Sequence, residues 1–185
     1  MNMKTFCLAL LAIIMFHINV FGQEFKVDGI YYKGTSMNPA TVEVAVNYYL
    51  AGSANIPASV TYSSIPYAVT SIGRKAFSFC KDLTSVMIPN SVTSISDSAF
   101  AYSFGLTSVS IPNSVTTIQS GAFAHCTSLT SINIPNSVTN IQSGAFTHCT
   151  SLTSINISNS ITTIGGSTFA HCTGLTSIII PNSVT

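Results

Sequence analysis

The sequence predicts a repeat solenoid, a stack of short coils that is mostly β, with short helical turns, a parallel strand ladder and a hairpin-rich β cap before the first coil. The first observation behind this prediction is a period of 23 residues in the second half of the 185-residue chain. The second is an alternation of apolar and polar residues, followed by a turn, within each period. Three columns keep the period without a break: leucine at Leu83, Leu106, Leu129, Leu152 and Leu175; phenylalanine at Phe77, Phe100, Phe123, Phe146 and Phe169; isoleucine at Ile72, Ile95, Ile118, Ile141 and Ile164.

One period, residues 129–151, shows how a coil is built. It opens with a short strand in which Ile132 and Ile134 alternate with polar residues, so we expect the apolar side chains to face the core and the polar ones the solvent. The Pro-Asn-Ser sequence that follows favours a turn, because proline ends strand pairing and the two polar side chains bond their own backbone. Further along, Phe146 and Cys149 are three residues apart, which places both on one face of a short helical turn. Such a coil cannot bury its apolar side chains alone, so the coils must stack.

The first half of the chain has a different pattern and is predicted to cap the array. An Asp-Gly pair at Asp28 lies between two β-prone runs, which predicts a hairpin. Valines alternate with other residues over 41–47, which predicts a further strand. The Ile-Pro segments at Ile56 and Ile65 both resemble the Ile-Pro turn of the later coils, so the register of the first coil is ambiguous by nine residues.

We therefore expect three parts: a signal peptide at 1–22, an N-terminal β cap at 23–64 and the repeat array at 65–185, with its last unit incomplete. The cap would shield the open strand edge and the core of the first coil. Thr185 falls in mid-unit, which leaves Ile178 and Ile180 on an uncapped coil. Either the sequence is a fragment of a longer protein or this end face pairs with something, and we favour the fragment.

Residues 1–22 have the three-part layout of a secretory signal. Lys4 supplies a positive start, residues 6–16 form an apolar run of eleven, and modest or small residues precede the expected cleavage after Gly22. The run falls short of the ~18 apolar residues that suggest a spanning helix. The alternative is an uncleaved membrane anchor. We expect a secreted or cell-surface protein with no membrane span after cleavage.

Charge is scarce. Only 6% of the residues are charged, against about 25% in a typical soluble domain, and the formal net charge is +1. Between residues 83 and 185 the sole charged side chain is Asp97. A nucleic-acid-binding protein needs several cations on one face to neutralise phosphates, so the composition excludes that class of partner.

The sequence of residues 106–118, Leu-Thr-Ser-Val-Ser-Ile-Pro-Asn-Ser-Val-Thr-Thr-Ile, followed by Gly-Ala-Phe and Cys126, resembles the unit of the BspA-like leucine-rich repeats. A period of 20–29 residues with L-x-x-L-x-L spacing is typical of leucine-rich repeats in general. The stretches 27–32 and 60–73 resemble the segment that opens such arrays. The resemblance covers nearly all of the mature chain. It implies a solenoid fold, export from a bacterium or protist, and adhesion or protein recognition without catalytic residues.

The outward-facing strand positions form the candidate binding site, a concave surface that we call the strand face. In repeat solenoids such a surface is the usual place for a partner. Its hydroxyl and amide groups suit an extended polypeptide or a glycan, although the lack of Trp weakens a sugar-stacking interpretation. Without Tyr, Trp or Arg anchors and without charge steering, we expect slow, salt-insensitive association. The candidate residues are Ser85, Met87, Ser108, Ser110, Ser131, Asn133, Ser154, Asn156, Ser177 and Ile179.

A His-Cys pair recurs in three successive coils, beginning with His125 and Cys126, and both residue types ligate zinc or copper. However, a helical turn that buries Phe123 and Cys126 directs His125 away from them, so we predict no metal site and no cofactor. No nucleophile–base pair or carboxylate pair occurs outside the cap, so we predict no catalytic residue and no enzyme.

Four cysteines share one column with a serine, and export makes disulfides between stacked neighbours an alternative. We favour buried thiols that fill the core. The members of this column are Cys80, Ser103, Cys126, Cys149 and Cys172.

Taken together, the sequence predicts an exported, non-enzymatic leucine-rich-repeat protein that mediates adhesion or protein recognition. The expected partner is a host matrix or cell-surface protein, or a protein of a neighbouring cell. The alternatives are a carbohydrate-binding module and a structural spacer without a ligand.

Overall fold

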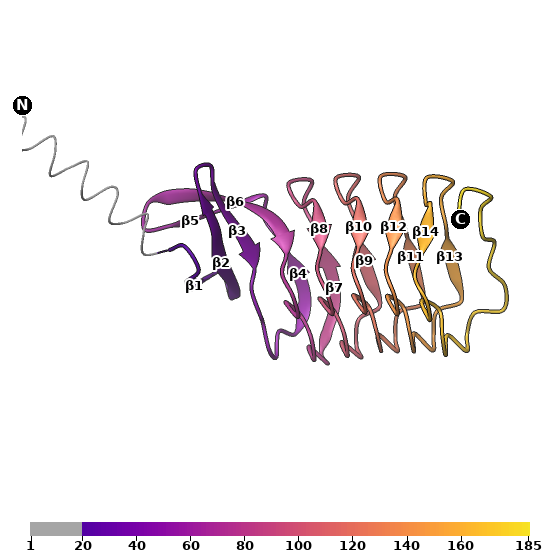
Figure 1. Ribbon diagram of the computed structural model, residues 1–185. Helices are drawn as coiled ribbons and strands as arrows, with labels where there is room; N and C mark the ends of the chain where they lie inside the picture. Colours follow the sequence, from indigo (N-terminus) through magenta and orange to yellow (C-terminus); the bar gives the residue numbers. More distant parts are fainter. Residues whose placement is uncertain (1–19) are drawn as a thin grey trace, which may run out of the picture.

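The computed structural model describes residues 20–185, which form an elongated solenoid (Figure 1). Most of the predicted signal peptide lies outside the described residues. Of its last three residues, Val20 is buried and Phe21 forms a parallel bridge with Gly34. Cleavage after Gly22 stays a prediction. None of the described residues forms a helix that could cross a bilayer.

The described chain contains short strands that fall into two ladders, one on each face of the solenoid (Figure 1). The larger sheet has the order β1-β2-β3-β6-β8-β10-β12-β14, with β5 paired to β6, whereas β4-β7-β9 and β11-β13 form the other face. The strands are β1 (Glu24–Val27), β2 (Ile30–Met37), β3 (Ala40–Val44), β4 (Gly52–Asn55), β5 (Ser59–Tyr62), β6 (Ile65–Ile72), β7 (Leu83–Met87), β8 (Ser94–Ile95), β9 (Ser108–Ser110), β10 (Thr117–Ile118), β11 (Ser131–Asn133), β12 (Asn140–Ile141), β13 (Ser154–Asn156) and β14 (Thr163–Ile164).

The predicted parallel ladder is confirmed. Ser131 pairs with Ser154 between β11 and β13, and Ile118 pairs with Ile141 between β10 and β12, so each residue lies beside its equivalent one period later. Backbone hydrogen bonds follow the same register, as from the Thr153 amide to the Thr130 carbonyl at 2.9 Å. The coils are therefore joined by backbone bonds as well as by side-chain packing.

The core consists of the periodic apolar columns. The leucine side chains at the start of the strands are fully buried from Leu83 to Leu152. The phenylalanine rings stack face to face, with centroids 5.0 Å apart for Phe100 and Phe123 and 5.3 Å apart for Phe123 and Phe146. Stacked rings gain favourable contact beyond the area they bury, so this column ties each coil to the next.

The segment predicted as a short helical turn is built differently. No helix occurs in the part of the chain that the structure describes. Successive turns replace the helix. Two of these turns are closed by hydrogen bonds of 3.2 Å, in which the amides of Ala122 and Cys126 each donate to the carbonyl three residues earlier. Gly121 and His125 have φ values of +61° and +60°. A residue in this left-handed region ends a right-handed helix, so each turn stops before a helix can begin.

The N-terminal strands form hairpins that continue into the array. The predicted Asp-Gly turn joins β1 to β2 and uses positive φ values at Asp28 and Gly29. The alternating valines lie in β3, where Val42 and Val44 are fully buried. Strand β3 pairs with β2 in antiparallel and with β6 in parallel orientation, so the cap sheet and the ladder are one sheet.

The nine-residue ambiguity of the first coil has a structural cause. Strand β4 pairs in parallel with β7, and the Ile56 amide donates to the Met87 carbonyl at 3.0 Å, which places Ile56 at the position of Ile88 in the next coil. Ile72 pairs with Ile95, so the later part of the coil is also in register. The extra residues between these two points fold out as strand β5, which turns back on β6. The first ladder strand thus lies within the predicted cap, and the boundary at residue 64 stays a prediction.

Replacing one ring of the phenylalanine column tests this account of the core. We expect Phe123→Ala to lower the free energy of unfolding by about 3–5 kcal/mol, because it removes a fully buried side chain and leaves a cavity between two stacked rings. Urea unfolding followed by circular dichroism measures the change. Thr130→Ala, on an exposed side chain of the next coil, is the control and should stay within about 0.5 kcal/mol of the original protein. Equal effects of the two substitutions would contradict a core organised on this column.

Candidate functional site

The strand face places the predicted binding residues in two rows. Ser85, Ser108 and their equivalents form one row, and Met87, Ser110 and their equivalents form the other. All of them are exposed except Ser85, which is half-buried. Strand pairing joins the residues of β7 to those of β9 and the residues of β11 to those of β13, and β9 contacts β11. Ser177 and Ile179 follow in the last coil, where no strand is present. Each row runs along the solenoid, so a partner would meet the same groups in successive coils.

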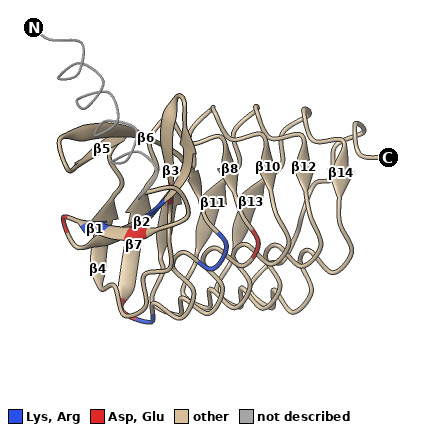
Figure 2. Cartoon of the chain, turned by 60° about the vertical axis from the view of Figure 1, so that its left-hand side comes forward, with Lys and Arg blue, Asp and Glu red and all other residues tan. Residues whose placement is uncertain are grey.

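The strand face carries no charge. Figure 2 shows that the charged residues gather in the cap and the first coils, and the sequence holds none beyond Asp97. The Asp97 carboxylate accepts a hydrogen bond from the Ser120 amide at 3.1 Å, and neither residue belongs to a strand of this face. The strand face therefore offers only neutral hydrogen-bonding groups.

A shallow hollow of about 440 Å³ lies on the strand face across β4, β7 and β9. Its lining includes Met87, which is 59% exposed, together with two residues that sequence analysis missed, Ser53 and Asn55. The sequence does contain a feature that could have revealed them, the Ile-Pro pair at Ile56. If this pair is aligned with the Ile-Pro pairs of the later coils, Ser53 and Asn55 occupy the outward positions of one more strand. The hollow gives the otherwise flat surface one partly apolar recess.

A second hollow, of about 330 Å³, lies where β3, β6 and β8 end, and it was also missed. It collects half of the ten charged side chains between residues 20 and 185. Neighbouring strands contribute opposite signs, because Lys33 pairs with Glu24 on one side and with Glu43 on the other. Cross-strand pairs of opposite charge stabilise a sheet modestly, which explains this arrangement as part of the cap. The charged lining residues are Glu24, Lys33, Glu43, Arg74 and Asp97.

Comparison with protein families agrees with this geometry. The family model described as "BspA type Leucine rich repeat region" matches residues 54–146 and 93–185, with six copies. The chain belongs to this BspA-type family. The earliest matched residue, 54, lies in β4, the first strand of the ladder. Among curated proteins, none matches the sequence.

Several solved structures resemble this BspA-type chain. A leucine-rich cell surface protein from Faecalibacterium prausnitzii is 32% identical with a TM-score of 0.75, over 88% of this chain and 44% of the other. A leucine-rich repeat protein from Bacteroides ovatus is 30% identical with a TM-score of 0.65, over 86% and 48%. The leucine-rich repeat protein of T. pallidum is 26% identical with a TM-score of 0.72, over 83% and 69%. The chain thus spans less than half the length of the first two.

The cysteine column of the BspA-type array points inward, as predicted, and its four cysteines are buried free thiols. Each thiol donates to a backbone carbonyl of the preceding coil, as from the Cys126 Sγ to the Phe100 carbonyl oxygen at 3.1 Å. In the coil that lacks a cysteine, the Ser103 hydroxyl donates to the Phe77 carbonyl instead. Burial raises the pKa of the Cys149 thiol to about 12, so the group stays protonated and keeps its donor at neutral pH.

The histidine column points the other way. His125 and His148 are half-buried and His171 is exposed, whereas the cysteine that follows each of them is buried. Between residues 20 and 185, no three His, Cys, Asp or Glu side chains converge on a point where a metal ion could be held. The recurring His-Cys pair is therefore split between the core and the surface.

Thiol labelling tests the role of the cysteines. At a pH of about 8, a thiol with a pKa of about 12 is ionised in only about one molecule in ten thousand, and burial also blocks the reagent. We expect iodoacetamide to leave Cys126, Cys149 and Cys172 unlabelled in the folded protein and to label all three in denaturant, as measured by peptide mass mapping. Rapid labelling without denaturant, or failure to label in denaturant without a reductant, would contradict buried free thiols.

Proposed function

We propose that this protein is an exported, non-enzymatic recognition module that uses the strand face to bind a protein of a host matrix, a host cell surface or a neighbouring cell. The observation that carries the proposal is a mostly exposed and uncharged surface in which serine and asparagine side chains recur in successive coils. Membership in the BspA-type family and the likeness to a structure described as a cell surface protein support the location at the cell exterior.

The surface suits an extended polypeptide that lies along the solenoid. Its serine and asparagine side chains present both donors and acceptors, which match the backbone amides and carbonyls of such a partner. The hollow beside Met87 would take one apolar side chain. Because each hydrogen bond contributes little net free energy, affinity would grow with the number of coils in contact.

A charge placed in the middle of the strand face tests where the partner binds. Asn133→Arg puts a bulky cation into the exposed row of β11, and we expect it to weaken binding at least about tenfold, which corresponds to about 1.4 kcal/mol. Surface plasmon resonance against a panel of purified extracellular matrix proteins measures the change. Asn136→Arg adds the same charge at an exposed turn of the same coil and is the matched control. If the control weakened binding as much as Asn133→Arg, the strand face would not be the binding surface.

Salt dependence separates neutral from electrostatic recognition. Because the strand face has no charge, we expect the dissociation constant to change by less than about threefold between low and physiological salt, measured on the same surface. A collapse of affinity over this range would contradict the proposal. A glycan array completes the test: binding to glycans without binding to any protein would favour a carbohydrate-binding module, and no binding to either would favour a spacer.

A further inference from the structure

Each coil contains two backbone positions in the left-handed region, four residues apart, and they are filled in different ways. The first position holds lysine, serine or glycine, with φ between 54° and 65°: Lys75, Ser98, Gly121, Gly144 and Ser167. The second holds a ring in every coil, with φ between 60° and 63°: Phe79, Tyr102, His125, His148 and His171, which we call the ring stripe. A bulky side chain in this region costs about 1–2 kcal/mol relative to glycine. The chain keeps rings at the second position despite that cost.

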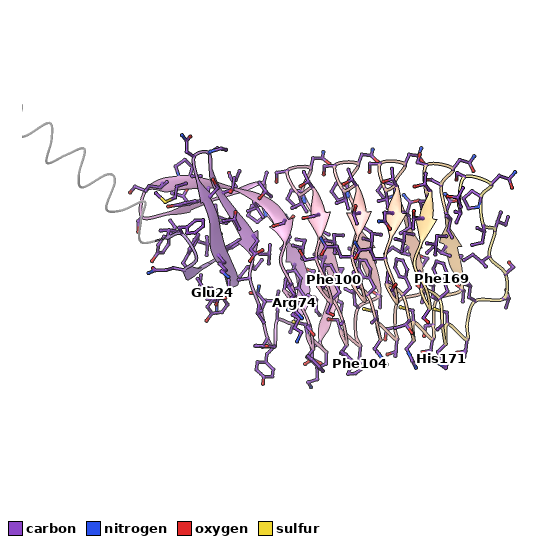
Figure 3. The ribbon with its side chains drawn as sticks, viewed as in Figure 1. Glu24, Arg74, Phe100, Phe104, Phe169 and His171 are labelled. Carbon is purple, nitrogen blue, oxygen red and sulfur yellow. The ribbon has the colours of Figure 1, made fainter. Side chains whose placement is uncertain are left out.

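The rings of the stripe stack on one another outside the core. Successive centroids lie 4.8, 4.4, 4.3 and 4.2 Å apart from Phe79 to His171, with angles between ring planes of 2°, 10°, 11° and 25°. Stacking offsets part of the backbone cost. Figure 3 shows His171 and Phe104 at the lower edge of the solenoid. Because an inner ring has neighbours on both faces, it presents its edge outward, and for the imidazoles the edge carries the nitrogens.

These imidazoles are the only side chains between residues 83 and 185 that can take up a positive charge by protonation. His148 lies between His125 and His171, and its Nδ1 is 3.2 Å from the Thr147 hydroxyl. His125 faces Tyr102 on its other side. The single carboxylate of this region, Asp97, accepts a hydrogen bond from Ser120 instead.

The middle ring, His148, is consequently easier to keep neutral than to protonate. Desolvation lowers the pKa of His148 first, and the neighbouring histidines lower it further. The folded state then binds fewer protons than the unfolded state, so the contribution of this group to stability falls as the pH drops through the ordinary range of histidine. A ligand that brings negative charge to the edge of the stack would instead favour the protonated imidazole.

We propose that the ring stripe is a second docking surface, which binds an acidic polypeptide segment when its histidines are protonated. Carboxylates accept strong hydrogen bonds from imidazolium N–H groups and would relieve the repulsion between neighbouring rings. Apolar groups lie beside Tyr102, the ring that stacks on His125 from the preceding coil: Phe79 and Phe104 both contact the Tyr102 ring and are 54% and 43% exposed. A polypeptide can present acidic and apolar side chains together, which a sulfated glycan cannot. This surface is separate from the strand face and does not depend on the function proposed for it.

Proton-coupled binding is tested with the full chain and a fluorescent synthetic peptide of alternating glutamate and phenylalanine. Fluorescence anisotropy should show affinity rising as the pH falls from about 7.5 to about 5.5, by up to about tenfold per pH unit for each proton taken up. The same peptide with glutamine in place of glutamate should bind weakly at both ends of this range.

Two triple variants isolate the histidines. His125→Tyr, His148→Tyr and His171→Tyr together keep a ring in each coil, as Tyr102 does in its own coil, and should abolish the pH dependence. His125→Asn, His148→Asn and His171→Asn together use a residue that tolerates the left-handed region and should have the same effect. Thermal unfolding checks that each variant is folded.

Three results with the peptides would overturn the proposal: no binding of the glutamate peptide at the lower pH, an unchanged pH dependence in the folded tyrosine variant, or equal binding of the glutamine peptide. A fourth such result would come from heparin. Heparin, a sulfated glycan, is then tested as a competitor of the peptide. If it bound the stripe at the lower pH and displaced the peptide at a similar concentration, the stripe would be a general anion site and not one for acidic polypeptides.

Discussion

Everything in this solenoid depends on backbone hydrogen bonds between equivalent positions of neighbouring coils. The bonds occur in the strands and also in the turns, where the Phe123 amide donates to the Ala145 carbonyl at 2.8 Å and the His125 amide to the Thr147 carbonyl at 2.8 Å. Buried backbone groups must be paired, so each coil has to follow the path of the previous one. The constant period of the sequence is the consequence, since a coil of another length would leave amides and carbonyls without partners. The one place where the length differs is accommodated outside the ladder, in strand β5.

This constraint explains which features could be predicted from the sequence. A residue that recurs every period must occupy the same place in each coil, so the buried leucine and phenylalanine columns and the outward rows of the strand face were all predictable. The turns were not, because the left-handed position of His125 is held by bonds to the next coil and by stacking, whereas local preference would place glycine or asparagine there. Strand β4 was obscured by the inserted residues, which hide its relation to β7. The charged hollow depends on the register of antiparallel strands in the cap, where no period guides the assignment.

The same constraint leaves the solvent-facing columns free to vary, and the chain uses them in different ways. The strand face repeats small neutral polar groups. The second left-handed position repeats rings, whereas the first, four residues earlier on the same turn segment, holds small residues or lysine. Two positions with the same backbone conformation thus carry different side chains along the whole array. The backbone geometry alone cannot account for that difference; contacts between rings of neighbouring coils can.

The scarcity of charge follows from the stacking as well. A charged residue in a repeated column would face a like charge in the next coil at about 4.8 Å, where two unit charges repel appreciably even in water. A neutral polar residue avoids this cost, so a nearly uniform array is best built from serine, threonine and asparagine. Arg74 and Asp97 share a column, since they are one period apart, and their charges have opposite signs. Histidine is the exception that this argument allows. It can repeat in neighbouring coils because a neutral imidazole does not repel its neighbour, and the repulsion arises only when neighbouring rings are protonated.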